Sequence, residues 1–326
     1  MHAPDFWNRP QRGWQARALS PLAALYTWGG RWRMASTIPA KAAVPVLCIG
    51  NLTLGGTGKT PVAIALCEML KADGQKPFFL TRGYGGTEKG PLRVDPARHT
   101  AQDVGDEPLL LAEAAPVIVA RDRVAGAARA AHEGASLIIM DDGFQNPTLA
   151  KTASLLVIDG TAHFGNGAVF PAGPLREPVA QGLMRAQGLI VMGGTLPPEV
   201  TSTALPCFHA HLAPDLQAAE RFQGQRVFAF AGIGRPAKFF STLKDCGAVL
   251  ASTQGFPDHF AFSENDIATL KARAAALDAL PVTTAKDLVR LPAALRDGIA
   301  VLPVRTEFSA PGEITGFLRK HFPSAC

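Results

Sequence analysis

The strongest chemical signal in the sequence is a glycine-rich loop that ends in Lys59 and Thr60. It follows Val44–Gly50, an apolar run with the length and β-branched content of a buried parallel strand, and precedes Pro61–Leu70, which has the pattern of a helix. Glycines in such a loop let backbone N–H groups turn toward a polyanion, and the helix dipole adds to the attraction. The residues expected to hold phosphates are Gly55, Gly56, Thr57, Gly58, Lys59 and Thr60.

This loop predicts a bound nucleotide with magnesium. Lys59 would reach the β- and γ-phosphates as a point charge, and the Thr60 hydroxyl would bind Mg²⁺. Thr53 stands where the strict P-loop pattern has its first glycine. A plain glycine turn is the alternative, and the adjacent lysine and threonine favour the nucleotide interpretation.

Two pairs of acidic residues follow or precede predicted elements. Asp141 and Asp142 come directly after the apolar strand 137–140, where a carboxylate downstream of a P-loop can lie beside the nucleotide's Mg²⁺. A turn or N-cap aspartate is the alternative. Asp106 and Glu107 precede the helical run LLLAEAA, and because the helix dipole alone favours acidic residues there, composition indicates a structural role for this pair.

Loops elsewhere carry further candidates. Arg82 and Tyr84 lie among glycines after the strand predicted at 76–81, on the edge where α/β proteins bind ligands, with a surface turn as the alternative. Arg176 lies in a long Gly/Pro-rich loop, and such loops are more often functional than idle. His259 precedes a predicted helix, and its sequence context alone favours an ordinary surface histidine.

The composition excludes several classes of protein. The chain has 326 residues and is 47% apolar, which suffices for two domains with ordinary cores. No apolar run approaches the ~18 residues of a membrane span, and no secretory signal peptide is expected. The cysteines lack metal-site spacing, which argues against zinc and disulfides and indicates a reducing compartment. They are Cys48, Cys67, Cys207, Cys246 and Cys326.

The net charge of +5 belongs to residues 1–43, where six basic residues face Asp5 alone, so general nucleic-acid binding is not predicted. All four tryptophans lie in the same segment. With Ser20 as N-cap and Pro21 as the first helical residue, a short amphipathic helix would follow. Its aromatic rings and flanking arginines suit a lipid interface, and a helix packed on its own domain is the alternative.

The alternation of strands and helices predicts an α/β fold: a P-loop NTPase domain with a mostly parallel sheet, a smaller second α/β domain, and the N-terminal amphipathic helix. We assign residues 1–43 to the membrane-contact segment, 44–220 to the P-loop domain and 221–326 to the smaller, lid-like domain. In this scheme Leu189–Met192 closes the first set of strands. The strand Ile299–Val304 and the helix Gly312–His321 belong to the second set.

Seven motifs together resemble the tetraacyldisaccharide 4'-kinase family, the lipid A 4'-kinases of Gram-negative bacteria. Dispersed in order along nearly the whole chain, they form a highly specific set: GNLTLGGTGKTP (Gly50–Pro61), TRGYGG (Thr81–Gly86), VGDEP (Val104–Pro108), MDDGFQ (Met140–Gln145), FPAGPLREP (Phe170–Pro178), DHFAFS (Asp258–Ser263) and VTTAKD (Val282–Asp287). The family's loop also lacks the early glycine. The chain departs from the family at Thr81 and Ala285, where serine and glutamate are usual.

The resemblance implies transfer of the ATP γ-phosphoryl group to the 4'-hydroxyl of a tetraacylated glucosamine disaccharide 1-phosphate, with Mg²⁺. The protein would act peripherally at the cytoplasmic face of the inner membrane, because a lipid with four chains does not readily leave the bilayer. No nucleic acid and no obligate protein partner are implied.

The resemblance also implies roles for single residues. Asp106 would be the general base for the 4'-hydroxyl, and His259 would approach it from the second domain, where an imidazolium would keep the carboxylate ionised. Arg176 and Lys59 would neutralise charge on the transferring phosphate. Metal binding would involve Thr60, Asp141, Asp142 and Glu107, and substrate binding would involve Arg82, Tyr84 and Gln145.

Two other functions share parts of the pattern. A regulatory ATPase switch that binds membranes would have a similar glycine-rich loop, but such proteins usually carry lysine where this chain has Leu54. A soluble small-molecule P-loop kinase would leave the N-terminal tryptophans unexplained.

Overall fold

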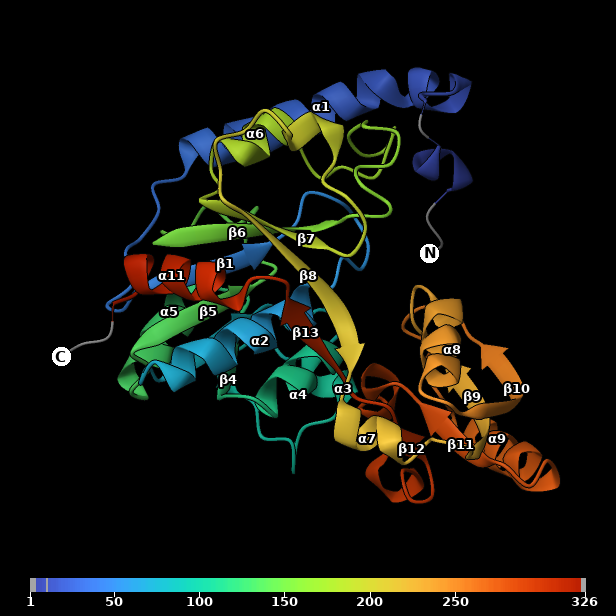
Figure 1. Cartoon of the computed structure of the whole chain (residues 1–326). Helices are drawn as coiled ribbons and strands as arrows, with labels where there is room; N and C mark the ends of the chain where they lie inside the picture. The colour runs from blue at the N-terminus through green and yellow to red at the C-terminus, as the bar shows by residue number, and fades with distance from the viewer. Residues whose placement is uncertain (1–3, 10, 324–326) are drawn as a thin grey trace.

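The computed structural model describes residues 4–9 and 11–323, so Cys326 lies outside the described residues. Within them the chain forms a nine-stranded sheet and a four-stranded sheet. Figure 1 shows the large sheet at upper left and the small sheet at lower right, with the long strand β8 running from the first toward the second. The α/β class and the mostly parallel sheet agree with the sequence prediction.

The large sheet is parallel except at its edges, where β13 and β3 run antiparallel to their neighbours. Its order is β13-β8-β7-β6-β1-β5-β2-β4-β3. Because β1 lies between β5 and β6, the loop after β1 opens at the carboxyl edge of the central strands, where α/β proteins bind ligands. The strands are β1 (Val46–Gly50), β2 (Pro77–Thr81), β3 (Leu92–Arg93), β4 (Val117–Val119), β5 (Leu137–Asp141), β6 (Ala153–Asp159), β7 (Gly188–Met192), β8 (Cys207–Pro214) and β13 (Val304–Phe308).

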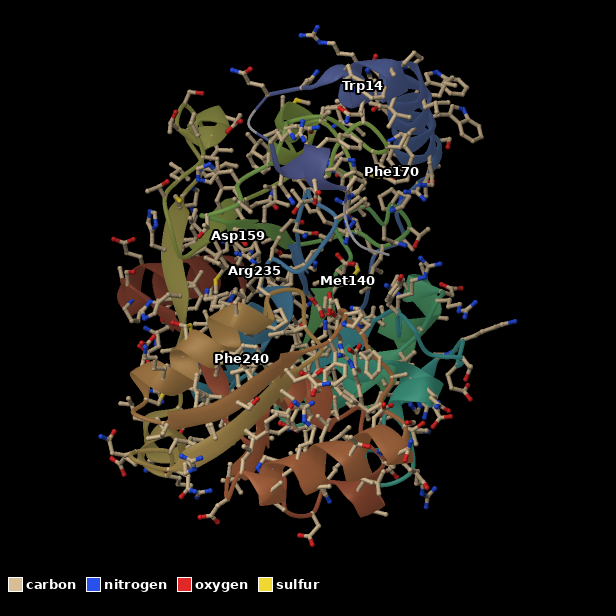
Figure 2. The ribbon with its side chains drawn as sticks, turned by 90° about the vertical axis from the view of Figure 1, so that its right-hand side faces the viewer. Trp14, Met140, Asp159, Phe170, Arg235 and Phe240 are labelled. Atoms are coloured by element: carbon tan, nitrogen blue, oxygen red, sulfur yellow. The ribbon has the colours of Figure 1, made fainter. Side chains whose placement is uncertain are left out.

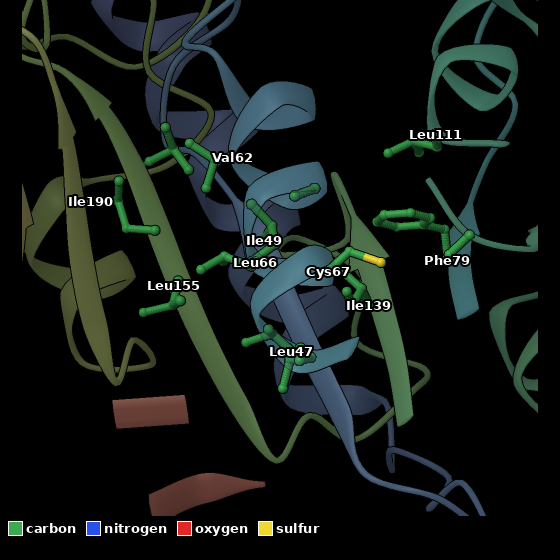
Figure 3. Packing of buried hydrophobic residues seen from close by; sticks show 14 of the residues in the cluster. Leu47, Ile49, Val62, Leu66, Cys67, Phe79, Leu111, Ile139, Leu155 and Ile190 are labelled. Carbon is green, nitrogen blue, oxygen red and sulfur yellow. The ribbon is translucent and has the colours of Figure 1, made fainter. Parts of the chain in front are cut away.

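Side chains of the central strands alternate between two buried faces. Leu47 and Ile49 of β1 pack with Leu66 of α2 on one face, as Figure 3 shows, whereas Cys48 points to the other. Because both faces are covered, the strands are continuous apolar runs. The first face is covered by α2 (Lys59–Ala72), α4 (Asp106–Ala112) and α11 (Pro311–His321), and the second by α5 (Arg123–His132) and α6 (Val179–Leu183).

The end of the chain returns to the large sheet, unlike the sequence scheme. That scheme closed the first set of strands at Leu189–Met192 and placed 299–304 and 312–321 in the second. Its strand at 299–304 is confirmed in part, because residues 300–301 pair within the small sheet, but the helix at 312–321 is not in the second set. In the structure β8 pairs with β7, β13 pairs with β8, and Leu318 of α11 shares a core with α2. Along β8, buried Phe208 alternates with exposed His209, a pattern weaker than that of the buried strands, and this is why the sequence reads as irregular there.

The small sheet and its helices form what we call the second unit, and the large sheet with its helices is the first unit. The second unit's strands run parallel in the order β10-β9-β11-β12. They are β9 (Arg226–Ala231), β10 (Val249–Gly255), β11 (Leu280–Thr283) and β12 (Ala300–Val301). One face packs on α8 (Pro236–Asp245) and the other on α9 (Glu264–Ala276).

The short helices of the whole described chain are α3 (Ala101–Val104), α7 (Leu216–Glu220), α10 (Ala285–Leu288), η1 (Asp5–Asn8), η2 (Pro198–Val200) and η3 (Ala293–Leu295).

The first long helix, α1, spans Trp14–Ser36, so the expected start at Ser20–Pro21 is wrong. Pro21 lies inside the helix, and because it has no N–H, the carbonyl of Arg17 lacks its usual donor. The hydroxyl of Ser20 donates to that carbonyl at 2.7 Å instead. A side-chain hydrogen bond therefore lets the helix continue through the proline.

Two alanines of α1 face the protein, and three of its tryptophans face outward. Ala16 and Ala23 pack against alanines of the loop 168–172. On the opposite side Trp14, Trp28 and Trp32 are 65–75% exposed; Trp14 is labelled at the outer surface in Figure 2. Among the described helices none is long and apolar enough to cross a membrane.

Candidate active site

The glycine-rich loop joins β1 to α2, and α2 begins at Lys59 rather than at the expected Pro61. The buried side chain of Asn51 braces the loop from inside, because its amide donates to the carbonyl of Thr53 at 2.8 Å and lies 3.3 Å from the Thr57 hydroxyl. Gly58 precedes the helix with φ +85°, a conformation that favours glycine. The backbone N–H groups at the start of α2 thus remain available to an anion.

The Gly/Pro-rich loop also holds the phosphate-binding loop in shape. The amide N–H of Leu54 donates to the carbonyl of Pro174 at 2.7 Å, and the amide N–H of Arg176 donates to the carbonyl of Leu52 at 2.7 Å. The side chain of Arg176 then reaches Thr53, whose carbonyl accepts from Nε at 3.2 Å. Two loops far apart in the sequence therefore form one rigid wall of the site.

Asp142 links the lysine and the arginine of this wall. Its Oδ1 lies 3.6 Å from Nζ of Lys59, and Nη1 of Arg176 donates to both of its oxygens at 2.9 and 3.1 Å. Burial raises the pKa of Asp142, but the charges of Lys59 and then Arg176 lower it by more than burial raises it. The pKa of Asp142 therefore lies below its usual range. With φ +51° its backbone is left-handed, which turns the chain sharply after β5.

The preceding carboxylate, Asp141, has the opposite character. It is 1% exposed, and within residues 4–9 and 11–323 neither of its oxygens has a hydrogen-bond partner. Burial, followed by the charge of Glu107, raises the pKa of Asp141 to about 8. Burial also raises the pKa of Glu107, although Lys286 and Lys59 oppose that rise.

An orphaned buried carboxylate beside a second carboxylate is a fitting place for a cation. Mg²⁺ prefers oxygen ligands and usually binds one or two carboxylates, with phosphates and waters completing its shell. The donors available are Asp141, Asp142, Glu107 and the Thr60 hydroxyl at the start of α2. The described residues contain no group of three or more His, Cys, Asp or Glu ready to hold a metal alone.

Asp106 and His259 meet although they lie 153 positions apart in the sequence. Nδ1 of His259, from the second unit, lies 3.2 Å from Oδ2 of Asp106 at the start of α4. Burial raises the pKa of Asp106, but the hydrogen bond from His259 and the charge of Arg290 outweigh it and hold that pKa well below its usual range. The expected pairing of these two residues is thus present in the geometry.

Arg290 was missed by the sequence analysis, although it lies closest to Asp106. Its Nε donates to Oδ2 of Asp106 at 2.9 Å, and its Nη1 donates to Oδ1 of Asp287 at 2.9 Å. Nζ of Lys286 lies 3.4 Å from Nε2 of His259. The spacing Lys286, Asp287, Arg290 was the available signal, since residues three or four apart on a helical turn lie on one side.

The residues proposed for the acceptor lie in different surroundings. Tyr84 is exposed, and its ring centroid is 6.4 Å from that of His259. It belongs to a loop packed on Gly105 so closely that a Cβ at Gly105 would lie 2.4 Å from the Tyr84 carbonyl oxygen. Arg82 is exposed beside this loop. Gln145 is held within the wall, where its Nε2 donates to the carbonyl of Asn51 at 2.9 Å.

A further contact joins the two units on the other side of β1. Arg235, in the loop after β9, forms an ion pair with Asp159 at the end of β6, and Figure 2 shows the two residues side by side. Residues of the second unit therefore approach the carboxyl edge of the large sheet at two places, at Asp106 and at Asp159.

The sequence and the fold both match proteins of known activity. A family model described as LpxK, tetraacyldisaccharide-1-P 4'-kinase, matches residues 15–323. A tetraacyldisaccharide 4'-kinase of Rhodospirillum centenum is 52% identical over 98% of this chain and 96% of its own length. One of Dinoroseobacter shibae is 48% identical over 100% of this chain and 99% of its own.

A solved structure extends the similarity to three dimensions. LpxK from Aquifex aeolicus, in complex with ATP, superposes with a TM-score of 0.76 at 25% identity, covering 94% of this chain and 99% of its own.

The raised pKa of Asp141, about 8 against an ordinary 3.8, predicts a pH-dependent stability. Between these values the folded state keeps a proton that the unfolded state has lost, so this group's contribution to the free energy of unfolding declines as pH rises and is lowest above pH 8. Without nucleotide or divalent cation, Asp141→Asn should raise the melting temperature relative to the original protein, by a margin that grows between about pH 5 and pH 8.

The matched control is Asp297→Asn, which changes an exposed carboxylate and should change the melting temperature little. Differential scanning calorimetry measures both. A lower melting temperature for Asp141→Asn at pH 8 would contradict the assignment of an unpaired buried carboxylate.

Proposed function

The chain belongs to the tetraacyldisaccharide-1-P 4'-kinase family, and we propose that it transfers the γ-phosphoryl group of ATP to the 4'-hydroxyl of a tetraacylated glucosamine disaccharide 1-phosphate. The observation that carries this proposal is the convergence of a phosphate-binding loop and an ionised carboxylate. Asp106 precedes Glu107 directly, and Glu107 lies within the electrostatic reach of Lys59. A triphosphate on the loop and a hydroxyl beside Asp106 would therefore be neighbours.

ATP would bind with its β- and γ-phosphates on the backbone N–H groups of residues 55–60 and on Lys59. Thr60, Asp141, Asp142 and Glu107 would hold Mg²⁺, which neutralises phosphate charge when it is bound. Because neither oxygen of Asp141 has a hydrogen-bond partner among the described residues, a bound cation would give its carboxylate a direct contact. Arg176, fixed by Asp142 and Thr53, would offer its remaining N–H groups to the transferring phosphoryl group.

Asp106 would act as general base. In the transfer, the oxygen of the 4'-hydroxyl bonds to the γ-phosphorus, the bond from that phosphorus to the β–γ bridging oxygen breaks, ADP leaves, and the hydroxyl proton passes to Asp106. His259 would keep Asp106 ionised and oriented. Arg82, Tyr84 and Gln145 would line the acceptor side, and the exposed ring of Tyr84 near His259 suits contact with a sugar.

The second unit would act as a lid on a P-loop NTPase domain. It supplies His259 and Arg290 at one end of the site and Arg235 at the other, so a nucleotide bound between them would be enclosed when the units are docked. Enclosure excludes water, which otherwise competes with the acceptor hydroxyl for the phosphoryl group.

The outer side of α1 would bring the protein to the membrane. Trp14, Trp28 and Trp32 face outward from a helix that packs through alanines, and Arg17 and Arg31 are exposed beside them. Large aromatic rings with flanking arginines favour the headgroup region of an anionic leaflet. The protein would thus lie peripherally on the cytoplasmic face of the inner membrane, where its lipid acceptor resides.

The proposed reaction predicts that ADP formation depends on the lipid. Purified protein with Mg·ATP should form ADP at least about 100-fold faster when a tetraacyldisaccharide 1-phosphate is present in detergent micelles, and Lys59→Ala should remove most of that increase. Lys244→Ala changes an exposed lysine of α8 and should leave the rate unchanged. A coupled ADP assay gives the rates, and ADP formation that ignores the lipid would contradict the proposal.

The membrane role of α1 predicts that its outward tryptophans determine vesicle binding. Replacing Trp28 and Trp32 together by serine should weaken sedimentation with phosphatidylglycerol-containing vesicles by roughly tenfold or more, since burying one large apolar side chain contributes about 1.5–3 kcal/mol. Leu216→Ser alters an equally exposed apolar residue on α7 and serves as the control. Equal binding of the double variant and the original protein would argue against this surface.

A further inference from the structure

We infer that Arg290 is the positioning residue of Asp106: it is fixed to the second unit by one edge of its guanidinium and orients the carboxylate of the first unit by the other. This inference rests on the proposed function, since it concerns the base of the proposed reaction. It is carried by the hydrogen bonds around a single buried side chain.

The inner edge of Arg290 is locked within the second unit. Its Nη1 donates to Oδ1 of Asp287 at 2.9 Å and to the carbonyl of Gly232 at 2.8 Å. Asp287 is fully buried and is itself held by the Thr284 hydroxyl at 2.7 Å and by the amide N–H of Gly232 at 3.0 Å. The guanidinium therefore has a fixed plane before it meets the first unit.

The GIG sequence at 232–234 explains part of this arrangement. It resembles the start of a dinucleotide fingerprint in sequence, but the backbone of its first residue, Gly232, forms hydrogen bonds with three residues of the second unit. The Gly232 carbonyl accepts from Arg290 and also from the amide N–H of His259 at 3.2 Å. A Cβ at Gly232 would lie 3.1 Å from Oδ1 of Asp287. The same backbone carbonyl thus fixes the positions of His259 and Arg290 relative to each other.

The outer edge of Arg290 crosses to the first unit. Nε donates to Oδ2 of Asp106 at 2.9 Å, and Nη2 donates to the same oxygen. With His259 Nδ1 at 3.2 Å, this oxygen faces three nitrogen atoms. The side chains of Arg290 and Asp106 are only 6% and 7% exposed, so water does not substitute for these contacts.

The division of donors between the two oxygens of Asp106 selects the reactive one. Oδ2 is occupied by Arg290 and His259, whereas Oδ1, as far as the structure describes the chain, accepts only from the amide N–H of Glu107 at 3.0 Å. A carboxylate oxygen has two lone pairs, so Oδ1 retains one that can accept a hydroxyl proton. Arg290 thereby leaves the free lone pair of Asp106 on Oδ1, the oxygen on the side of Glu107.

The arrangement requires arginine rather than a cation alone. A planar guanidinium can bond along two edges at once, whereas the single ammonium of lysine cannot span Asp106 and the pair Asp287–Gly232 in fixed geometry. Arg290→Lys should therefore keep part of the charge effect and lose part of the orientation. Misplacing a catalytic group by about 1 Å can lower a rate about 100-fold.

The test is a double-mutant cycle on the full-length protein with Mg·ATP and the lipid acceptor in micelles. Arg290→Gln should lower kcat about 10- to 100-fold while KM for ATP stays within about twofold, and Arg290→Lys should fall between it and the original protein. In an Asp106→Asn background, Arg290→Gln should lower kcat no further. Arg273→Gln, an arginine of α9 that contacts Gln254 and Phe228, is the matched control and should keep full activity.

The cycle separates positioning from a general structural role. Equal fold-losses for Arg290→Gln in both backgrounds, or full activity of Arg290→Gln beside an active original protein, would overturn the inference. Melting temperature and ATP binding are measured for every variant, and if Arg290→Gln does not fold, Arg290→Lys carries the cycle. If the original protein shows no lipid-dependent ADP formation, the proposed function is contradicted, and hydrogen exchange then tests the contact between Arg290 and Asp106. The amides of α4 should exchange faster in Arg290→Gln than in Arg273→Gln. Equal exchange in the two variants would overturn the inference about Arg290.

Discussion

The buried carboxylate of Asp106 is the constraint on which the arrangement of the two units depends. A charge removed from water must be paired and hydrogen-bonded, or its burial is strongly unfavourable. Its own unit gives Asp106 one backbone N–H, from Glu107. His259 and Arg290, which supply the remaining donors, both belong to the second unit. An ionised Asp106 and the docked position of the second unit therefore stabilise each other.

The carboxylates at the carboxyl edge of the large sheet have pKa values that are shifted in opposite directions. Opposing cations hold the pKa of Asp106 and of Asp142 below the usual range, whereas burial raises the pKa of Asp141 to about 8. Groups whose environments separate their pKa values in this way can take different roles in one reaction. Asp106 stays ionised and therefore has a free carboxylate to receive the hydroxyl proton, although its lowered pKa makes it a weak base, and Asp141, whose oxygens have no hydrogen-bond partner among the described residues, suits a cation that arrives with the nucleotide.

Local signals made much of this structure predictable. The strand, loop and helix around Lys59, the strand that ends at Asp141, and the helix that starts at Asp106 follow from apolar runs and turn chemistry within about ten residues. The meeting of Asp106 with His259 came only from resemblance to a family, because no local pattern links residues 153 positions apart.

The misses have physical causes. The start of α1 was misplaced because proline usually opens a helix, whereas here the Ser20 hydroxyl serves the carbonyl that Pro21 leaves free. The return of α11 to the large sheet was missed because a half-exposed β8 has a weak pattern. Arg290 was missed because its spacing from Lys286 and Asp287 indicates only that these residues share one side of a turn, and does not identify the carboxylate that Arg290 meets in another unit.

The most direct test of the central claim is the turnover of Asp106→Ala, His259→Ala and the double variant with Mg·ATP and the tetraacyldisaccharide acceptor. If the two residues act as one unit across the junction, the double variant should be about as slow as the slower single variant. If the fold-losses of the single variants multiply in the double variant, the two residues act independently, and the claim that the second unit completes the site through Asp106 is contradicted.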